Sequence, residues 1–282
     1  MDFGAVLPWQ LTVVPIQTAL SAIPPTTGNN PAYAWTAKYG YVGIGIQQSP
    51  QVKNQISLPP AIADTIVVDA MNIYGMSAAA LWLPPSVYPA LSDAPTGAQL
   101  VSSLDICRWV VSNYADVGTL HQDLICISKK EVTSLGQVIA FWDPEQTPTG
   151  SKTPLHFQFH DRSGKSLVLE LCKGELIITD NSKLGVMTNA PFLDWHVTNL
   201  QNYCLANNVD MASDATQTFV ELKVSPAGHG GGLKALSASA LPADRFLRTV
   251  FNINDSLPFL NQLTSVHLPN PAISHVMNLL KN

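Results

Sequence analysis

The stretch from Leu155 to Asp180 constrains the fold more than any other part of the 282-residue sequence. It opens with Leu155, Phe157 and Phe159 alternating with polar residues, which is the spacing of a half-buried β-strand. Two groups of turn-forming residues then separate this strand from two further runs with strand patterning. The three runs are 155–160, 166–171 and 176–178. The stretch therefore predicts an antiparallel meander of three strands.

Hydrophobic spacing elsewhere predicts two more strands, at 39–47 and 77–83, and three helices. The first helix would carry apolar side chains at three- and four-residue steps on one face: Leu100, Leu104, Cys107, Val111 and Tyr114. The second would begin near Thr119, whose hydroxyl has the spacing of a helix cap, and the third near Ala243. Antiparallel strands with separate amphipathic helices indicate a layered α+β domain.

The surface of such a domain would be poor in charge. Charged residues make up 12% of the chain, about half the typical ~25% of soluble domains, and the formal net charge is -5. This composition supplies no basic field for nucleic acid. No run of apolar residues approaches the ~20 that span a bilayer, so we expect neither a nucleic-acid nor a membrane partner.

Residue types that hold metals are present, but they are not spaced for a metal site. The four cysteines stand singly, without a CxxC pair, and we interpret them as small buried apolar residues. They are Cys107, Cys126, Cys172 and Cys204. His156 and His160 would lie ~13 Å apart on one strand, too far to share an ion, and are predicted to be surface polar residues. We expect no metal and no cofactor.

A long motif follows the predicted meander. The run from Gly185 to Tyr203 contains Thr188-Asn189-Ala190-Pro191 and, in register with it, Asn199-Leu200. With these residues the chain resembles the choloylglycine hydrolase family, which contains conjugated bile salt hydrolases and penicillin V acylases. Three shorter segments keep the family's order along the chain: Met1-Asp2-Phe3, Asp69-Ala70-Met71-Asn72 and Ala243-Asp244-Arg245-Phe246-Leu247-Arg248.

The resemblance implies a single domain over residues 1–282, folded as an αββα four-layer sandwich of two antiparallel sheets between helix layers. Family members are N-terminal-nucleophile hydrolases, in which a cysteine exposed by processing attacks a linear amide while its own α-amino group serves as base. The implied partner is a small-molecule acyl amide substrate, with no cofactor. The family tends to form homotetramers, so we expect a homo-oligomer.

Three residues take catalytic roles by this resemblance. Asp2 would contact the amine and thiol of the nucleophile, Asn189 would donate its side-chain amide to the oxyanion, and Arg245 would steady the charge of the thiolate and the intermediate. Each residue also has a plainer interpretation. Asp2 could cap a turn or a helix, Asn189 could form a turn before a proline, and Arg245 could form a salt bridge on a helix surface.

The two ends of the sequence depart from the family pattern. No cysteine stands at the nucleophile position, which the family places on a strand before Asp2, and the family's other active-site arginine would precede Met1. After Leu280 the family continues into closing strands with a Tyr-Thr motif that is absent here. We therefore expect a chain truncated at both ends, which lacks the nucleophile strand and the closing strands. A catalytically inactive, truncated homologue is the rival interpretation.

The residue type at Trp82 gives an indication of the substrate class. Trp82 stands where bile salt hydrolases of the family usually carry Asn and some penicillin acylases carry Tyr. A flat aromatic side chain suits an apolar acyl group, although a buried core tryptophan is the alternative. We predict that Trp82 binds substrate in an enzyme like penicillin V acylase or N-acyl-homoserine lactone acylase, with conjugated bile salt hydrolysis as the alternative. The compartment is open, and the preference for penicillin acylases favours a periplasmic or secreted bacterial protein.

Overall fold

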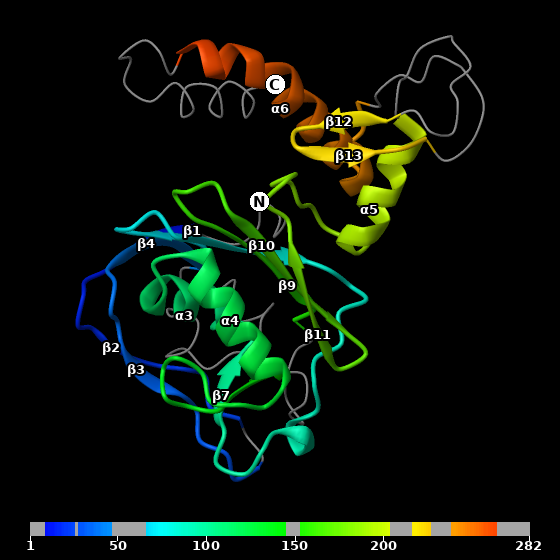
Figure 1. Ribbon diagram of the computed structural model, residues 1–282. Helices are drawn as coiled ribbons and strands as arrows, with labels where there is room; N and C mark the ends of the chain where they lie inside the picture. Colours follow the sequence, from blue (N-terminus) through cyan, green and yellow to red (C-terminus); the bar gives the residue numbers. More distant parts are fainter. Residues whose placement is uncertain are drawn as a thin grey trace. The chain divides into compact units, whose positions relative to one another are not determined.

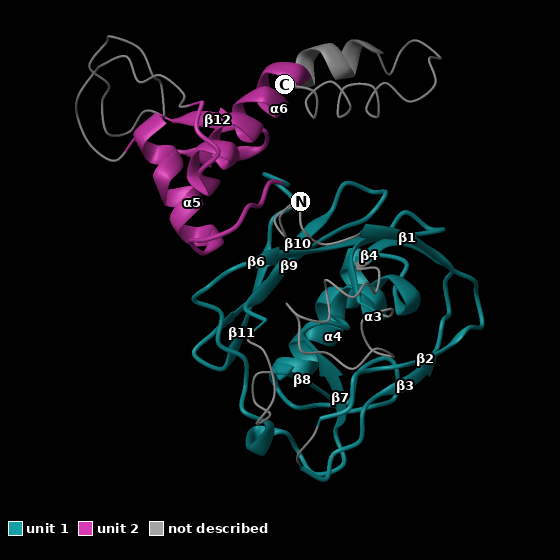
Figure 2. Cartoon of the chain, turned by 180° about the vertical axis from the view of Figure 1, so that it is seen from behind, with its two compact units in different colours: residues 1–185 teal, residues 186–282 magenta. Residues whose placement is uncertain are grey.

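The computed structural model describes six stretches of the chain: residues 9–25, 28–46, 66–144, 153–203, 216–226 and 238–263. The chain forms two compact units, residues 1–185 and 186–282, which Figure 2 colours separately. The expectation of one domain over residues 1–282 stays a prediction.

The first unit is built on a seven-stranded sheet with the strand order β1-β4-β5-β6-β9-β10-β11 (Figure 1). Every neighbouring pair of strands runs antiparallel. The strands are β1 (Trp9–Val14), β4 (Tyr41–Ile46), β5 (Val67–Asn72), β6 (Ser77–Trp82), β9 (Leu155–His160), β10 (Ser166–Cys172) and β11 (Glu175–Asp180). The predicted meander is confirmed as β9, β10 and β11, and the two other predicted strands are confirmed as β4 and β6.

Two tight turns produce the meander. Gly164 has a φ of 86° in the first turn, and Lys173 and Gly174 have φ values of 53° and 83° in the second. Two consecutive residues with positive φ match the right-handed twist of a hairpin, and glycine adopts this region at no steric cost. The second turn is flanked by the pair of Cys172 and Glu175. The turn residues therefore set the register of the three strands.

Two helices pack on one face of this sheet. They are α3 (Ile106–Asn113) and α4 (Val117–Ser128). The prediction that the first helix reaches back to Leu100 is wrong, because Leu100 lies in strand β7 (Gln99–Ser102), which pairs in parallel with β8 (Ile139–Trp142). Helix α4 begins earlier than predicted, because the Asp116 side chain accepts a hydrogen bond from the Thr119 backbone and caps the helix.

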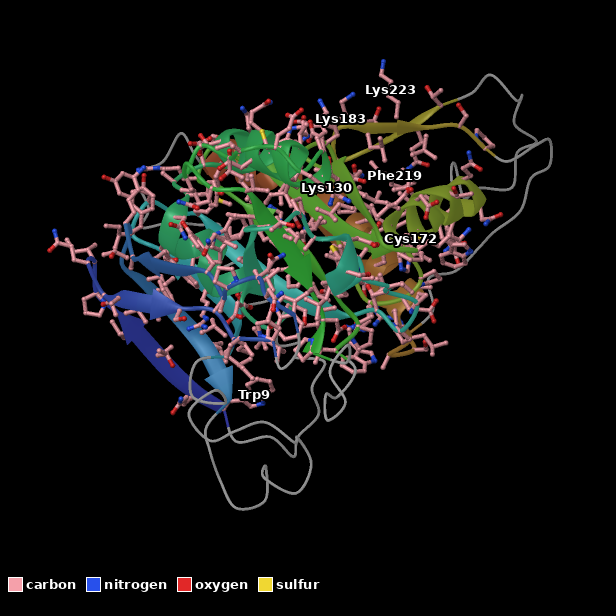
Figure 3. The ribbon with its side chains drawn as sticks, turned by 90° about the horizontal axis from the view of Figure 1, so that it is seen from below. Trp9, Lys130, Cys172, Lys183, Phe219 and Lys223 are labelled. Carbon is pink, nitrogen blue, oxygen red and sulfur yellow. The ribbon has the colours of Figure 1, made fainter. Side chains whose placement is uncertain are left out.

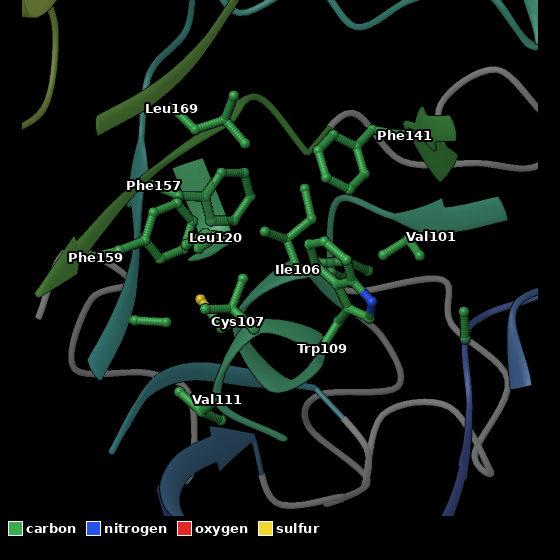
Figure 4. Packing of buried hydrophobic residues seen from close by; sticks show 14 of the residues in the cluster. Val101, Ile106, Cys107, Trp109, Val111, Leu120, Phe141, Phe157, Phe159 and Leu169 are labelled. Atoms are coloured by element: carbon green, nitrogen blue, oxygen red, sulfur yellow. The ribbon is translucent and has the colours of Figure 1, made fainter. Parts of the chain in front are cut away.

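The core of the first unit lies between the sheet and these helices (Figure 4). Phe157 and Phe159 of β9 place their ring centroids 6.3 Å apart, and Leu169 of β10 lies beside them. Ile106 and Cys107 of α3 face them, and all five side chains are at most 1% exposed. Burying an apolar side chain of this size stabilises a fold by about 1.5–3 kcal/mol. The contact between β9, β10 and α3 is therefore a main source of stability.

A buried ion pair fastens the chain near its first strands to helix α3. The first unit also contains strands β2 (Ala19–Ser21) and β3 (Ala34–Thr36), which pair with each other, and a short 3-10 helix, η1 (Leu91–Asp93). Asp105 accepts the Ile23 backbone N–H at 2.8 Å and the Nε–H of Arg108 at 2.9 Å. Arg108 also donates from Nη2 to the backbone oxygen of Ser21 at 2.6 Å. The pair thereby links β2 to the helix layer.

The second unit combines helices with one hairpin. Its elements are α5 (Leu193–Leu200), η3 (Gln201–Tyr203), β12 (Gln217–Phe219), β13 (Leu222–Val224) and α6 (Pro242–Leu263). Helix α6 begins beside the predicted start at Ala243, and the side chains predicted to face inward are buried: Phe246, Leu247 and Val250. The hairpin packs on this helix, because Phe219 meets Phe251 with ring centroids 5.2 Å apart, while Lys223 points outward (Figure 3).

Tyr41, the first residue of β4, gives the first unit a predictable response to alkaline pH. It is 3% exposed, and its burial raises the pKa of the phenol from 10.0 to about 12. Because the folded state then holds this proton more tightly than the unfolded state, stability falls as the pH rises from about 10 to about 12. We expect this group to lower the free energy of unfolding by about 1.4 kcal/mol per pH unit across that window.

Urea unfolding followed by tryptophan fluorescence at a series of alkaline pH values measures this slope. The variant Tyr41→Phe should show a shallower slope than the wild type. Tyr74→Phe, at a residue 49% exposed, is the matched control and should keep the wild-type slope. If Tyr41→Phe also keeps the wild-type slope, Tyr41 does not carry the effect.

Candidate active site

Asn189 lies in the loop that leads into helix α5. The loop continues through a cis peptide bond between Ala190 and Pro191. Asn189 is 7% exposed, so its side-chain amide is buried. Because buried polar atoms are almost always hydrogen-bonded, the partners of this amide fix its orientation.

Arg245 supplies one of these partners. It lies in the first turn of α6, where its backbone N–H donates to Leu241 at 3.0 Å and its Nε–H donates to the backbone oxygen of Ala240 at 3.1 Å. Its Nη2 donates to Oδ1 of Asn189 at 2.6 Å. A guanidinium group only donates, so the oxygen of the Asn189 amide faces Arg245 and the NH2 group is the donor end.

This contact joins two predicted site residues that stand 56 positions apart in the sequence. The Asn189 side chain is thus held by α6, which a plain turn residue does not require. A cation behind an amide donor is an arrangement that stabilises negative charge developing at that donor. The structure brings the two side chains together, and their catalytic roles stay predictions.

Asp2 and Trp82 are the other two predicted site residues. Asp2 lies outside the residues that the structure describes. Trp82 ends strand β6 in the first unit, pairs with Leu155 of β9 and is 38% exposed. It is therefore not a buried core tryptophan, and part of its ring surface lies at the protein surface.

His196 is a further residue of this site, to which the sequence pattern assigns no role. Its Nε2 lies 3.1 Å from the backbone oxygen of Asn189, and its ring stacks on Phe246 with centroids 4.9 Å apart. The side chain is 1% exposed. Helical spacing does carry a signal, because His196 falls with Leu193 and Leu200 on the buried face of α5.

The prediction that both histidines of β9 are surface residues is wrong for His156. Its side chain is 1% exposed, and Nδ1 lies 3.3 Å from Oε1 of Glu170, which is 3% exposed. These two side chains lie on the face of the sheet opposite Phe157. Because both are buried, this face of the sheet is covered, as is the face on which the helices pack. His160 is partly buried, and burial lowers the pKa of its ring. Alternation along one strand does not reveal that both faces are covered.

The cysteines of the described stretches are free thiols: Cys107, Cys126 and Cys172. Cys107 is buried as predicted, and burial raises the pKa of its thiol, which disfavours the reactive thiolate. The other two are only partly buried, and Cys204 lies outside the described residues. Across the six described stretches, no group of three or more His, Cys, Asp or Glu side chains is placed to hold a metal, and no helix is long and apolar enough to cross a membrane.

A cavity of about 410 Å³ opens elsewhere in the first unit. It lies between the 89–95 segment, the end of α4 and the β10–β11 turn, over the apolar side chains of Ile127, Ile139 and Phe141. Neither Trp82 nor the pair on the second unit lines it. The residues that line the cavity therefore include none of the predicted site residues.

Comparison with known proteins gives a family and a fold. The family model of linear amide C-N hydrolases, choloylglycine hydrolase family, matches residues 1–266. A conjugated bile acid hydrolase from Lactobacillus gasseri is 29% identical over 188 residues, covering 66% of this chain and 54% of that protein. A penicillin V acylase from Pectobacterium atrosepticum is 27% identical over 171 residues, covering 58% of this chain and 38% of that protein.

Among solved structures, penicillin V acylase from Agrobacterium tumefaciens matches with a TM-score of 0.63 and 22% sequence identity, covering 100% of this chain and 66% of that one. This similarity confirms the predicted α+β fold. The chain spans about half the length of the curated bile acid hydrolase that it matches.

Proposed function

Because the chain belongs to the choloylglycine hydrolase family of linear amide C-N hydrolases, we propose that it serves the hydrolysis of a linear amide with an apolar acyl group. The observation that carries this proposal is the contact of Arg245 with Asn189, which orients a buried amide donor. Such a fixed donor is what an acyl-transfer site needs for its oxyanion. The proposal concerns the protein that carries the nucleophilic cysteine, which the family places before Asp2.

In the proposed reaction the cysteine thiolate attacks the amide carbon, and the carbonyl oxygen becomes an oxyanion. Asn189 donates its NH2 group to this oxygen, while Arg245 holds the other end of the amide. As the intermediate collapses, the C–N bond breaks and the α-amino group of the cysteine gives the proton that it took from the thiol to the departing amine. The acyl-enzyme that remains is then hydrolysed by water. Asp2 would hold the amine and thiol of the nucleophile in place. None of these steps requires a metal or a cofactor.

In this proposal Trp82 contacts the acyl group of the substrate. An indole that is 38% exposed supports an aromatic or fatty acyl group, as in penicillin V or an N-acyl-homoserine lactone. Conjugated bile salts are the second candidate, because the relative from Lactobacillus gasseri is named a conjugated bile acid hydrolase.

The proposal also includes assembly as a homotetramer. Size-exclusion chromatography coupled to light scattering measures the mass of the assembly in solution and tests this part of the proposal.

The test begins with the genomic reading frame upstream of Met1, where cysteine and arginine codons are expected. Protein beginning at that cysteine is then incubated with penicillin V, an N-acyl-homoserine lactone and a glycine-conjugated bile salt, and amine release is measured. Hydrolysis of any of the three supports the proposal. A folded protein that carries the cysteine and releases no amine is instead the inactive homologue.

The variant Trp82→Asn tests the acyl preference. Aromatic contacts contribute roughly 0.5–1.5 kcal/mol beyond burial of area, so the ratio of kcat/KM for penicillin V over a bile salt should fall by up to about tenfold. Tyr74→Asn changes another exposed aromatic of the first unit and should leave the ratio unchanged. An unchanged ratio in Trp82→Asn would remove Trp82 from the acyl site.

A further inference from the structure

We propose that His196 is a positioning residue that holds Asn189 in place and links it to the helix that carries Arg245. The proposal deepens the function proposed above and rests on it for its catalytic meaning. All of the residues concerned lie in the second unit.

The hydrogen bond defines which nitrogen of His196 carries a proton. Nε2 lies 3.1 Å from the backbone oxygen of Asn189, and a carbonyl oxygen only accepts. Nε2 must therefore be the protonated nitrogen. The imidazole is 1% exposed, so water does not compete for this bond. A buried carbonyl that loses its donor is left without a hydrogen bond, and this loosens the loop.

Two ring contacts hold the imidazole in this orientation. One face stacks on Phe246 with centroids 4.9 Å apart and an interplanar angle of 25°. The ring of Trp195 meets the imidazole edge to face at 5.3 Å. A ring with two side-chain torsions that is packed in this way has little freedom to turn its Nε2 away from the loop.

Two side chains donate hydrogen bonds to Asn189. Its backbone oxygen accepts from His196 on α5, and its side-chain oxygen accepts from Arg245 on α6. Phe246, which stacks on the histidine, follows Arg245 directly in the chain. One imidazole thus couples the position of the loop to the position of the helix. With its backbone oxygen and its side-chain oxygen both held, Asn189 has its NH2 group preorganised to donate to an oxyanion.

Two variants separate the hydrogen bond from simple core packing. His196→Phe keeps a ring that can stack on Phe246 but has no donor. His196→Gln keeps an N–H donor with similar reach but has no ring. If the hydrogen bond positions the loop, the first variant should loosen Asn189 and the second should largely retain it.

The measurement is hydrogen exchange by nuclear magnetic resonance on the 282-residue chain, read at the Asn189 side-chain amide and at Nε–H of Arg245. We expect His196→Phe to speed exchange at both groups by about tenfold or more, and His196→Gln to stay within about threefold of wild type. Backbone amides of the β12–β13 hairpin are the internal control and should not change. Unchanged exchange at Asn189 in His196→Phe overturns the proposal, as does equal loosening of the whole unit by both variants.

A second measurement needs no variant. The long-range proton–nitrogen spectrum of wild-type His196 should show a proton on Nε2, and a neutral ring protonated only on Nδ1 overturns the proposal. Neither measurement uses activity, so a protein that hydrolyses nothing would refute the proposed function and leave this result standing. In the active protein, His196→Phe should lower kcat with little change in KM, and His196→Gln should restore most of it.

Discussion

Replacing Asp105 with alanine should destabilise the first unit by about 3–5 kcal/mol. Asp105 is fully buried, and its removal leaves the guanidinium of Arg108, 3% exposed, without its carboxylate. The backbone N–H of Ile23 loses its acceptor at the same time. Burial raises the pKa of Asp105 although Arg108 opposes the shift, so desolvation outweighs the attraction between the two charges. The pair is therefore costly to break even though its net contribution is small.

Urea unfolding followed by circular dichroism measures this effect. Asp93→Ala removes an exposed carboxylate from η1 and should change stability by no more than about 0.5 kcal/mol. The double variant Asp105→Leu with Arg108→Met should recover part of the loss, because it replaces both charges with apolar side chains. A double variant that is less stable than Asp105→Ala would show that the backbone contacts, and not the stranded charge, dominate.

The parts of this fold that follow from the sequence are those with local causes. The meander from Leu155 to Asp180 depends on alternation and on turn residues, both of which can be read along the chain. The strand at Leu100 could not be found in this way, because it forms by pairing in parallel with Ile139 and its neighbours. Its leucine also happens to fit the helical spacing of the residues after it. Pairing with a distant strand overrode that local pattern.

The features of the candidate site also fall into those that a short run of sequence indicates and those that depend on contacts between distant segments. The motif around Asn189 and the helix start at Arg245 are indicated by the family resemblance, since each is a short run of sequence. Their hydrogen bond depends on how α5 and α6 pack, and the role of His196 depends on the same packing. The burial of His156 does not follow from the strand pattern for a related reason, because it comes from cover on the second face of the sheet. The hydrophobic pattern of a single strand or helix does not show which other elements it contacts.

In the protein that carries the nucleophile, Asn189→Asp should lower kcat by about 10²–10³-fold, a loss of roughly 2.7–4 kcal/mol of transition-state stabilisation. The substitution is nearly isosteric, and a carboxylate still accepts the hydrogen bond from Arg245. The NH2 donor is lost, and a negative charge stands where the oxyanion would form. Asn189→Ala should lose activity to a similar extent, because it removes the donor and the acceptor together.

Steady-state kinetics of amine release, with circular dichroism to verify folding, tests this prediction. Since the interaction is made mainly in the transition state, kcat and kcat/KM should fall together while KM changes little. Asn202→Asp, on the exposed side of η3, introduces the same change of charge in the same unit and should keep wild-type kinetics. If folded Asn189→Asp retains activity within about threefold of wild type, Asn189 does not donate to the oxyanion, and its contact with Arg245 serves only to hold the loop.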